Sequence, residues 1–127
     1  MGANEFDVIR TWFAPLAKDA AARGLKDDVA VLESAGRLVI TTDAIVEGVH
    51  FLPQDPIATV AMKAVRVNVS DLIAKGARPR YALLTLIWPD SRRAEDLRYF
   101  GDAIAGEFET FGISMLGGDT TSTKGPL

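Results

Sequence analysis

The stretch YALLTLIWPD, residues 81–90, decides the fold, because it places a strand between two helical patterns. Residues 81–88 form one strongly apolar run, which Pro89 and Asp90 end. A run of this kind is typical of a strand that is buried on both faces, as in a sheet covered by helices. The stretch therefore predicts a doubly buried strand from Tyr81 to Trp88.

The residues after this stretch predict a helix and then a second strand. Asp90 or Ser91 can cap a helix that reaches about Phe111. One side of that helix carries Leu97, Phe100, Ile104 and Phe108 at helical spacing. The strand predicted over Ile113–Leu116 runs directly into the segment GGDTT, residues 117–121.

The residues before the stretch predict a helix from Asp55-Pro56 to Lys75-Gly76, with the proline at the first helical position. One stripe of this helix, apolar except for Asn68, consists of Ile57, Val60, Ala61, Ala64, Val65, Asn68 and Leu72. Val65, Val67 and Val69 also alternate as a strand would. The longer period and the two end signals favour the helix.

The N-terminal part predicts a helix from Asn4 to about Ala22, followed by a hairpin with strands at Val29–Leu32 and Leu38–Thr42. The resulting order is helix, hairpin, helix, strand, helix, strand. This order indicates an α/β (α+β) fold with a mixed β-sheet and helices packed on one face. The acids fall at element ends, where loops converge on ligands.

The composition fits one compact, soluble domain over residues 1–127, since 48% of the residues are hydrophobic. A net charge of −3 without a basic block argues against a nucleic-acid partner. Because cysteine is absent, any metal must be held by oxygen or by the single histidine. With neither a signal peptide nor a membrane span in the sequence, we expect a cytoplasmic protein without a membrane partner.

Aspartates are the candidate chemical groups. Mg²⁺ prefers oxygen ligands and is usually held by one or two carboxylates together with substrate phosphates. Asp43 follows a predicted strand, Asp71 shares a helix face with Asn68 and Lys75, and Asp119 follows two glycines that let backbone amides approach a phosphate. Each aspartate alone is more often an ordinary turn or surface residue. Together they predict a magnesium site for ATP phosphates.

Other nucleotide and hydrolase motifs are missing from the sequence. Residues 24–28, GLKDD, lack the second glycine and the Lys-Ser/Thr pair of a Walker A loop, and no nucleophile elbow or His-rich metal motif occurs. Five cations could draw phosphates inward, although cations scattered on a helix are usually just solvated: Lys63, Arg66, Lys75, Arg78 and Arg80. His50 taken alone is more often a structural or surface histidine.

Four segments taken in order closely resemble thiamine-monophosphate kinase. They are GLKDDVAVL at 24–32, TTDAIVEGVHF at 41–51, NVSDL at 68–72 and GGDTT at 117–121. The resemblance spans nearly the whole chain. That family belongs to a superfamily with aminoimidazole ribonucleotide synthetase, selenophosphate synthetase and a hydrogenase maturation factor, and the segment at 42–51 favours the kinase.

The resemblance implies a set of site residues. Several magnesium ions around the ATP phosphates would be bound by Asp27, Asp28, Thr41, Thr42, Asp43, Asp71 and Asp119. Gly118 and Asp119 would contact ATP, and His50 the thiamine monophosphate. No side chain acts as a catalytic acid, base or nucleophile, since positioning and metal ions carry the reaction. Lys26 departs from the glycine of many members, so the local turn differs there or a charge is neutralised.

The resemblance also implies an architecture. Family members continue past GGDTT into a C-terminal domain that completes both sites, so residues 1–127 resemble the N-terminal ATP- and magnesium-binding domain alone. In the family these domains pair their sheets across a two-fold axis, which predicts a homodimer. An open edge strand such as Leu38–Thr42 would otherwise invite unwanted pairing.

The expected reaction is transfer of the γ-phosphoryl group of ATP to thiamine monophosphate, giving the diphosphate and ADP in thiamine diphosphate biosynthesis. The acceptor phosphate is largely ionised at neutral pH and needs little base catalysis. Two alternatives stay open. The chain could be a catalytically silent, dimerising module that binds magnesium or nucleotide, or part of a sister ATP-dependent enzyme of the superfamily.

Overall fold

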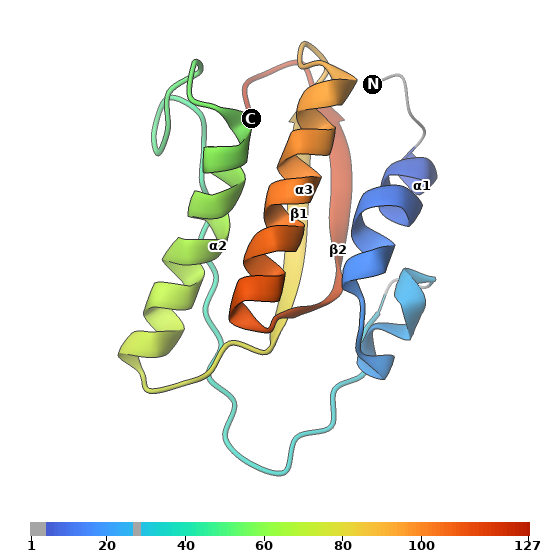
Figure 1. Ribbon diagram of the computed structural model, residues 1–127, viewed down its shortest axis with the longest axis vertical. Helices are drawn as coiled ribbons and strands as arrows, with labels where there is room; N and C mark the ends of the chain where they lie inside the picture. The colour runs from blue at the N-terminus through green and yellow to red at the C-terminus, as the bar shows by residue number, and fades with distance from the viewer. Residues whose placement is uncertain (1–4, 27–28) are drawn as a thin grey trace.

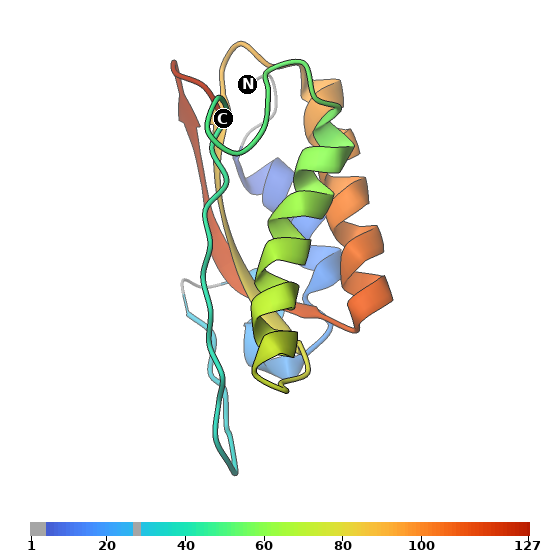
Figure 2. The same cartoon turned by 90° about the vertical axis from the view of Figure 1, so that its left-hand side faces the viewer.

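Two long helices lie over one face of a two-stranded parallel sheet in the computed structural model, which describes residues 5–26 and 29–127. The helices are α2, Ile57–Ala74, and α3, Ala94–Phe111; the strands are β1, Tyr81–Pro89, and β2, Ser114–Thr123. Figure 2 shows the sheet on one side and the helices on the other. The predicted α/β class and the placement of helices on one face are confirmed.

Helix α2 settles the ambiguity of the valine-rich segment in favour of the helix. Val65 and Val69 are buried and Val67 is only half-buried, as expected for a helical face rather than for alternating strand faces. Pro56 stands as the N-cap rather than at the first helical position. Helix α3 begins at Ala94, later than predicted, because Arg93 keeps an extended backbone.

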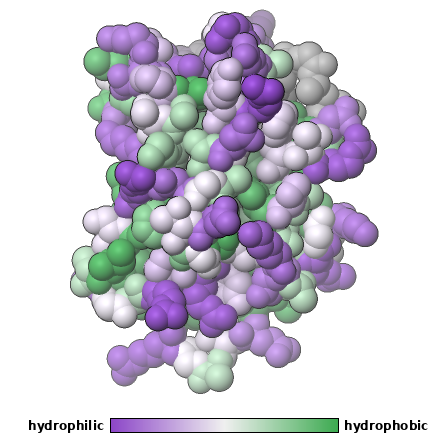
Figure 3. Space-filling view, viewed as in Figure 1, coloured by the Kyte–Doolittle hydropathy of each residue, from purple (hydrophilic) through white to green (hydrophobic). Residues whose placement is uncertain are grey.

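The core lies between α2, α3 and the inner face of the sheet. Trp88 of β1 is 1% exposed and packs edge-on against Phe100 of α3, with ring centroids 5.9 Å apart. Ile104 of α3 and Met115 of β2 are equally inaccessible to solvent. In Figure 3, which looks onto the helices, hydrophilic side chains are spread over this side of the molecule.

The prediction that β1 is buried on both faces is wrong for this chain. Leu83 is 71% exposed and Ile87 is 49% exposed, whereas Leu86 and Trp88 face the core. The physical reason is that the helices described here cover only one face of the sheet (Figure 2). The chain therefore carries an apolar outer face on β1.

The first predicted helix is broken into short pieces. The described part has α1, Glu5–Val8, a π-helical turn η1, Ile9–Phe13, and two 3₁₀ segments, η2, Ala14–Leu16, and η3, Ala20–Leu25. Pro15 lacks the N–H that a continuous helix needs. The Asp19 side chain starts η3 by accepting a hydrogen bond from the Ala21 amide at 2.8 Å. The predicted cap Asn4 lies outside the described residues.

The predicted hairpin is also wrong. Residues 29–46 contain no strand, and all of residues 31–40 are exposed. Among the described residues, Val31 donates a backbone hydrogen bond to Ala21, and residues 32–45 make no backbone hydrogen bond to another element. Without the hairpin the described sheet is purely parallel rather than mixed, because an extended segment needs a ladder partner to become a strand.

The segment at 117–121 lies inside β2, not in a loop. Strand β2 is longer than predicted and pairs Gly118 with Leu84 and Asp119 with Thr85. The register shifts by one residue after the pair of Ala82 and Met115, which is a β-bulge. No helix that the structure describes is long and apolar enough to cross a membrane.

Candidate functional site

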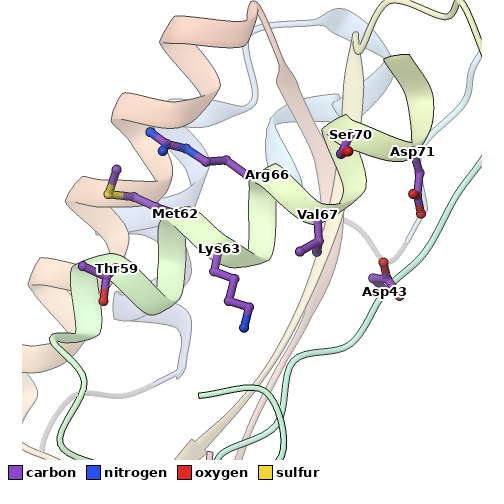
Figure 4. A pocket seen from close by; sticks show the side chains of 8 residues that line it. All are labelled: Asp43, Thr59, Met62, Lys63, Arg66, Val67, Ser70 and Asp71. Atoms are coloured by element: carbon purple, nitrogen blue, oxygen red, sulfur yellow. The ribbon is translucent and has the colours of Figure 1, made fainter. Parts of the chain in front are cut away.

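A cavity of about 630 Å³ lies beside α2, between the helix and the extended segment that carries Asp43 (Figure 4). Seven of its eight lining residues belong to α2 and recur at helical spacing. The full lining is Asp43, Thr59, Met62, Lys63, Arg66, Val67, Ser70 and Asp71. The cavity thus joins two of the predicted metal ligands that are far apart in the sequence.

The acidic end of the cavity is formed by Asp43 and Asp71. Figure 4 shows the Asp71 side chain directed toward the segment that carries Asp43. Thr41 belongs to the same group, because its Oγ1 lies 3.4 Å from Asp71 Oδ2, at the long limit for a hydrogen bond. Both carboxylates are exposed, and of the two only Asp71 has this contact with Thr41, so their oxygens are available to a cation.

The basic part of the cavity is formed by Lys63 and Arg66, which precede Asp71 on α2 by eight and five residues. Arg66 donates from Nε and Nη2 to the two carboxylate oxygens of Glu107 on α3, at 2.7 and 2.9 Å. This bidentate bond, together with the charge of Glu107, raises the pKa of Arg66 above its ordinary value. Lys63 Nζ donates to the His50 carbonyl oxygen. The cavity therefore has one acidic and one basic wall.

His50 belongs to a turn over residues 46–51 rather than to the cavity lining. Its Nδ1 accepts a hydrogen bond from the Val46 amide at 3.0 Å, and the side chain is exposed. The turn is bound to the rest of the molecule through Lys63 and through an ion pair of 2.7 Å between Glu47 and Arg92. The predicted substrate-binding histidine is thus presented by an anchored turn next to the cavity.

Gly118 and Asp119 lie on β2, and neither lines the cavity. A side chain at position 118 would overlap the backbone of Leu84, and Gly118 has φ of +154°. This glycine therefore has a structural reason, close pairing of β1 and β2, besides the predicted contact with ATP. Asp119 is exposed.

Of the remaining predicted ligands, Asp27 and Asp28 lie outside the described residues. Thr42 is exposed and does not line the cavity. Within residues 5–26 and 29–127, no three acidic or histidine side chains gather closely enough to hold an ion unaided. The donor set at Asp43, Asp71 and Thr41 still fits Mg²⁺, which commonly takes one or two carboxylates and completes its shell with water and phosphate.

Several residues of this site were not predicted as functional. The sequence pattern of Lys63 and Arg66 is that of scattered, solvated cations, and no pattern marks Glu107, Glu47 or Arg92 as functional. A signal for the first two existed, because Thr59, Lys63, Arg66 and Ser70 form a polar stripe beside the apolar stripe of α2. The partners of Arg66 and Glu47 are 41 and 45 residues away in the sequence, so spacing does not reveal them.

The sequence of this chain is similar to those of known proteins. The family model for AIR synthase related protein, N-terminal domain, matches residues 26–127. The thiamine-monophosphate kinase of Caulobacter vibrioides is 44% identical over 127 residues, which cover 98% of this chain and 36% of the relative.

Solved structures show the same likeness. The crystal structure of thiamine-monophosphate kinase from Stenotrophomonas maltophilia superposes with a TM-score of 0.77 at 34% identity, covering 100% of this chain and 40% of that one. A structure of AaThiL complexed with AMPPCP and TMP gives a TM-score of 0.62 at 35% identity, covering 65% of this chain and 27% of that one. The chain thus spans well under half the length of these relatives.

Proposed function

Because the chain belongs to the family of AIR synthase related protein, N-terminal domain, we propose that it forms the ATP- and magnesium-binding part of a thiamine-monophosphate kinase. The reaction is transfer of the γ-phosphoryl group of ATP to the phosphate of thiamine monophosphate. The observation that carries this proposal is the cavity that joins Asp43 and Asp71 opposite Lys63. The complex of the related AaThiL with AMPPCP, an ATP analogue, and TMP supports the choice of both substrates.

The acidic wall is the proposed metal-binding part. Asp43, Asp71 and Thr41 would hold Mg²⁺ together with the other predicted ligands, Asp27, Asp28, Thr42 and Asp119. Bound magnesium ions neutralise phosphate oxygens in an in-line phosphoryl transfer. The exposed carboxylates of Asp43 and Asp71 suit this role, since they reach solvent and substrate without breaking a buried contact.

The basic wall is the proposed phosphate-orienting part. The acceptor is already largely ionised at neutral pH, so the protein has to align two anions rather than remove a proton. Lys63 lies on the cavity wall and also holds the turn of His50, which we assign to the thiamine monophosphate. Glu107 keeps the Arg66 guanidinium at the same wall through two hydrogen bonds.

A phosphotransfer assay of the complete gene product tests the metal assignment. Asp43→Asn and Asp71→Asn should each lower turnover by at least about 100-fold, because the amide no longer offsets the charge of the cation. Asp102→Asn is the matched control, since Asp102 is an exposed aspartate of α3 outside the cavity. Near-normal turnover in both cavity variants would contradict the metal assignment.

A second copy of the chain is the proposed partner of the outer sheet face. Leu83 and Ile87 of β1 are exposed there, and residues 32–45 make no backbone hydrogen bond to another element among the described residues. In the extended segment Ile40 is 84% exposed. Burying such a surface is favourable by about 25 cal/mol per Å² of apolar area. Pairing of two sheets across a two-fold axis would satisfy both features.

Light scattering tests the dimer. Leu83→Glu should convert a dimer to a monomer, because a charge cannot be buried unpaired at such an interface. Tyr99→Gln is the control, since Tyr99 is an exposed apolar residue on the helix side. A monomeric wild-type chain, or a dimer that tolerates Leu83→Glu, would contradict the proposal.

Because ATP is the co-substrate, we place the protein in the cytoplasm.

The alternative function is a catalytically silent module that binds magnesium or nucleotide. Two observations favour it. The proposed metal ligands Asp43 and Asp71 lie within this chain, and the relatives of the chain are much longer than the chain itself. Activity of the 127-residue chain alone would exclude it. A substrate panel with ATP consumption as the measurement separates the kinase from a sister enzyme of the superfamily.

A further inference from the structure

The turn over residues 46–51 is a small structure of its own. The amides of Val49 and His50 both donate to the Val46 carbonyl oxygen, at 3.1 and 2.8 Å. The Gly48 amide donates to the Phe51 carbonyl oxygen at 2.8 Å, and Gly48 takes a left-handed φ of +79° that other residues rarely adopt. Phe51 is buried and anchors the end of the turn in the core.

The hydrogen bond within this turn determines which nitrogen of His50 carries the proton. Nδ1 accepts from the Val46 N–H, so Nδ1 must present its lone pair. In the neutral ring the hydrogen is then on Nε2. An Nε2–H group donates to an oxygen of a ligand, and it is unable to coordinate a metal ion through that nitrogen.

The start of the turn is held by side-chain contacts and by one backbone hydrogen bond. The chain that leads into it, residues 32–45, makes no backbone hydrogen bond to another element in the described part. Arg92 Nη2 donates to Glu47 Oε2 at 2.7 Å, and each side chain of this pair is only 16% exposed. The Glu47 amide donates to the Leu127 carbonyl oxygen at 2.6 Å. A largely desolvated ion pair holds a segment more firmly than an exposed one does.

We propose that Arg92 is a positioning residue for the substrate site: through Glu47 it holds the 46–51 turn so that His50 offers Nε2–H to a phosphate-bearing substrate. This inference rests on the proposed function for the identity of that substrate. Arg92 follows β1 and lies outside the cavity of Asp43 and Asp71, so it acts through the turn rather than by contact with the reacting atoms.

The protonated nitrogen can be observed directly, because His50 is the single histidine of the chain. A long-range ¹H–¹⁵N spectrum of the 127-residue chain at pH 8, without substrate, distinguishes the two ring nitrogens. We expect one neutral tautomer with the hydrogen on Nε2. A ring with the hydrogen on Nδ1, or an equal mixture of both forms in the wild type, overturns the proposal.

Variants test whether Arg92 causes this state. Arg92→Met should change the single tautomer to a mixture, and Arg92→Lys should restore most of it. Arg93→Met is the matched control, because the neighbouring Arg93 is 71% exposed and pairs at 3.0 Å with Asp96, in the first turn of the helix that Arg93 precedes. A wild-type ring spectrum in Arg92→Met contradicts the positioning role. If Arg92→Met loses its dispersed amide spectrum and is therefore unfolded, Glu47→Gln replaces it in the test. A wild-type ring spectrum of His50 in Glu47→Gln equally contradicts the positioning role of Arg92.

Kinetics of the complete gene product provide the second measurement. Arg92→Met should raise KM for thiamine monophosphate about tenfold, as expected for one weakened hydrogen bond to the substrate, with KM for ATP changed less than about twofold. Equal effects on both constants overturn the inference. Wild-type protein without any phosphotransfer overturns the proposed function instead, and the ring spectrum still reports on the turn.

Discussion

Replacement of Gly118 by alanine separates two explanations of this glycine. A Cβ at this position would overlap the carbonyl oxygen of Leu84 and lie 2.6 Å from its carbonyl carbon and 2.9 Å from its amide nitrogen. These are backbone atoms of the paired strand, so a rotamer change of Leu84 gives no relief. The two strands must separate locally or shift in register.

The size of the effect follows from this contact. Holding a non-glycine residue in such a backbone conformation costs about 1–3 kcal/mol, and the disturbed pairing of β1 with β2 adds to it. We therefore expect Gly118→Ala to lower the free energy of unfolding by about 3 kcal/mol or more. For a chain of this size that corresponds to a fall in Tm of roughly 10 °C.

Thermal and urea unfolding, followed by far-ultraviolet circular dichroism, measure this change. Gly117→Ala is the matched control, because a Cβ there would meet only the flexible Leu83 side chain, at 3.6 Å. We expect the control to stay within about 0.5 kcal/mol of wild type. Both variants are then titrated with ATP and Mg²⁺ under conditions where they are folded.

The structural explanation of Gly118 is refuted by one pattern of results. If Gly118→Ala unfolds at the wild-type temperature but has lost its affinity for ATP, the glycine serves the approach of a phosphate, as the resemblance to the kinases implies. If stability falls while the folded fraction binds ATP normally, the glycine serves the strand pairing.

Three further predictions concern the helices. Gly106→Ala should stabilise the chain by up to about 1 kcal/mol, because the position is helical, exposed and free of neighbours for a Cβ; a lower Tm would contradict this. The hydrogen bond from Arg93 lowers the pKa of Asp96 below its ordinary value of 3.8. The contribution of the Asp96 carboxylate to stability is therefore present above about pH 4 and is lost as the pH falls through the lowered pKa. The urea midpoints of wild type and Asp96→Asn should converge below pH 3.8. Arg66→Met should destabilise more than Glu107→Gln, because it leaves the buried Glu107 carboxylate without its partner whereas Arg66 is 55% exposed; the reverse order in chemical unfolding would contradict this reading.

Local patterns predicted the elements that the sequence marks by both periodicity and end signals. Helices α2 and α3 and strand β1 were found because their periodicity and end signals agree with their environment. The same patterns failed for residues 29–42, where β-branched residues predicted a hairpin. A strand needs a backbone partner, and the described part of the chain offers none there.

The first helix failed for a different reason. Phe13 and Leu16 are buried as their helical spacing predicts, whereas Phe6 is 71% exposed. Pro15 interrupts the hydrogen-bond ladder within this stretch, and the chain responds with short turns of different pitch. The spacing of apolar residues indicates which side chains are buried, but it does not indicate whether the helix backbone is continuous.

The site shows what a one-dimensional pattern omits. Asp43 and Asp71 were predicted as ligands from their type and flanking residues, and the structure brings them to one cavity. The sequence does not single out the cations of that cavity, because cations spaced along a helix are usually solvated. Only the fold shows that Glu107 holds one of them and that the other, Lys63, reaches His50.

Helix α2 accounts for this difference, because two of its faces have separate tasks. The apolar face with Val60, Val65 and Val69 packs against the core and sets the position of the helix. Because the core fixes the orientation of the helix, the adjacent polar face, from Thr59 to Asp71, lies along the cavity. A substitution that rotates the helix in the core would therefore move Lys63, Arg66 and Asp71 together relative to Asp43, which lies on the extended segment. Phosphoryl transfer between two anions requires fixed placement of these groups, since alignment supplies most of its rate.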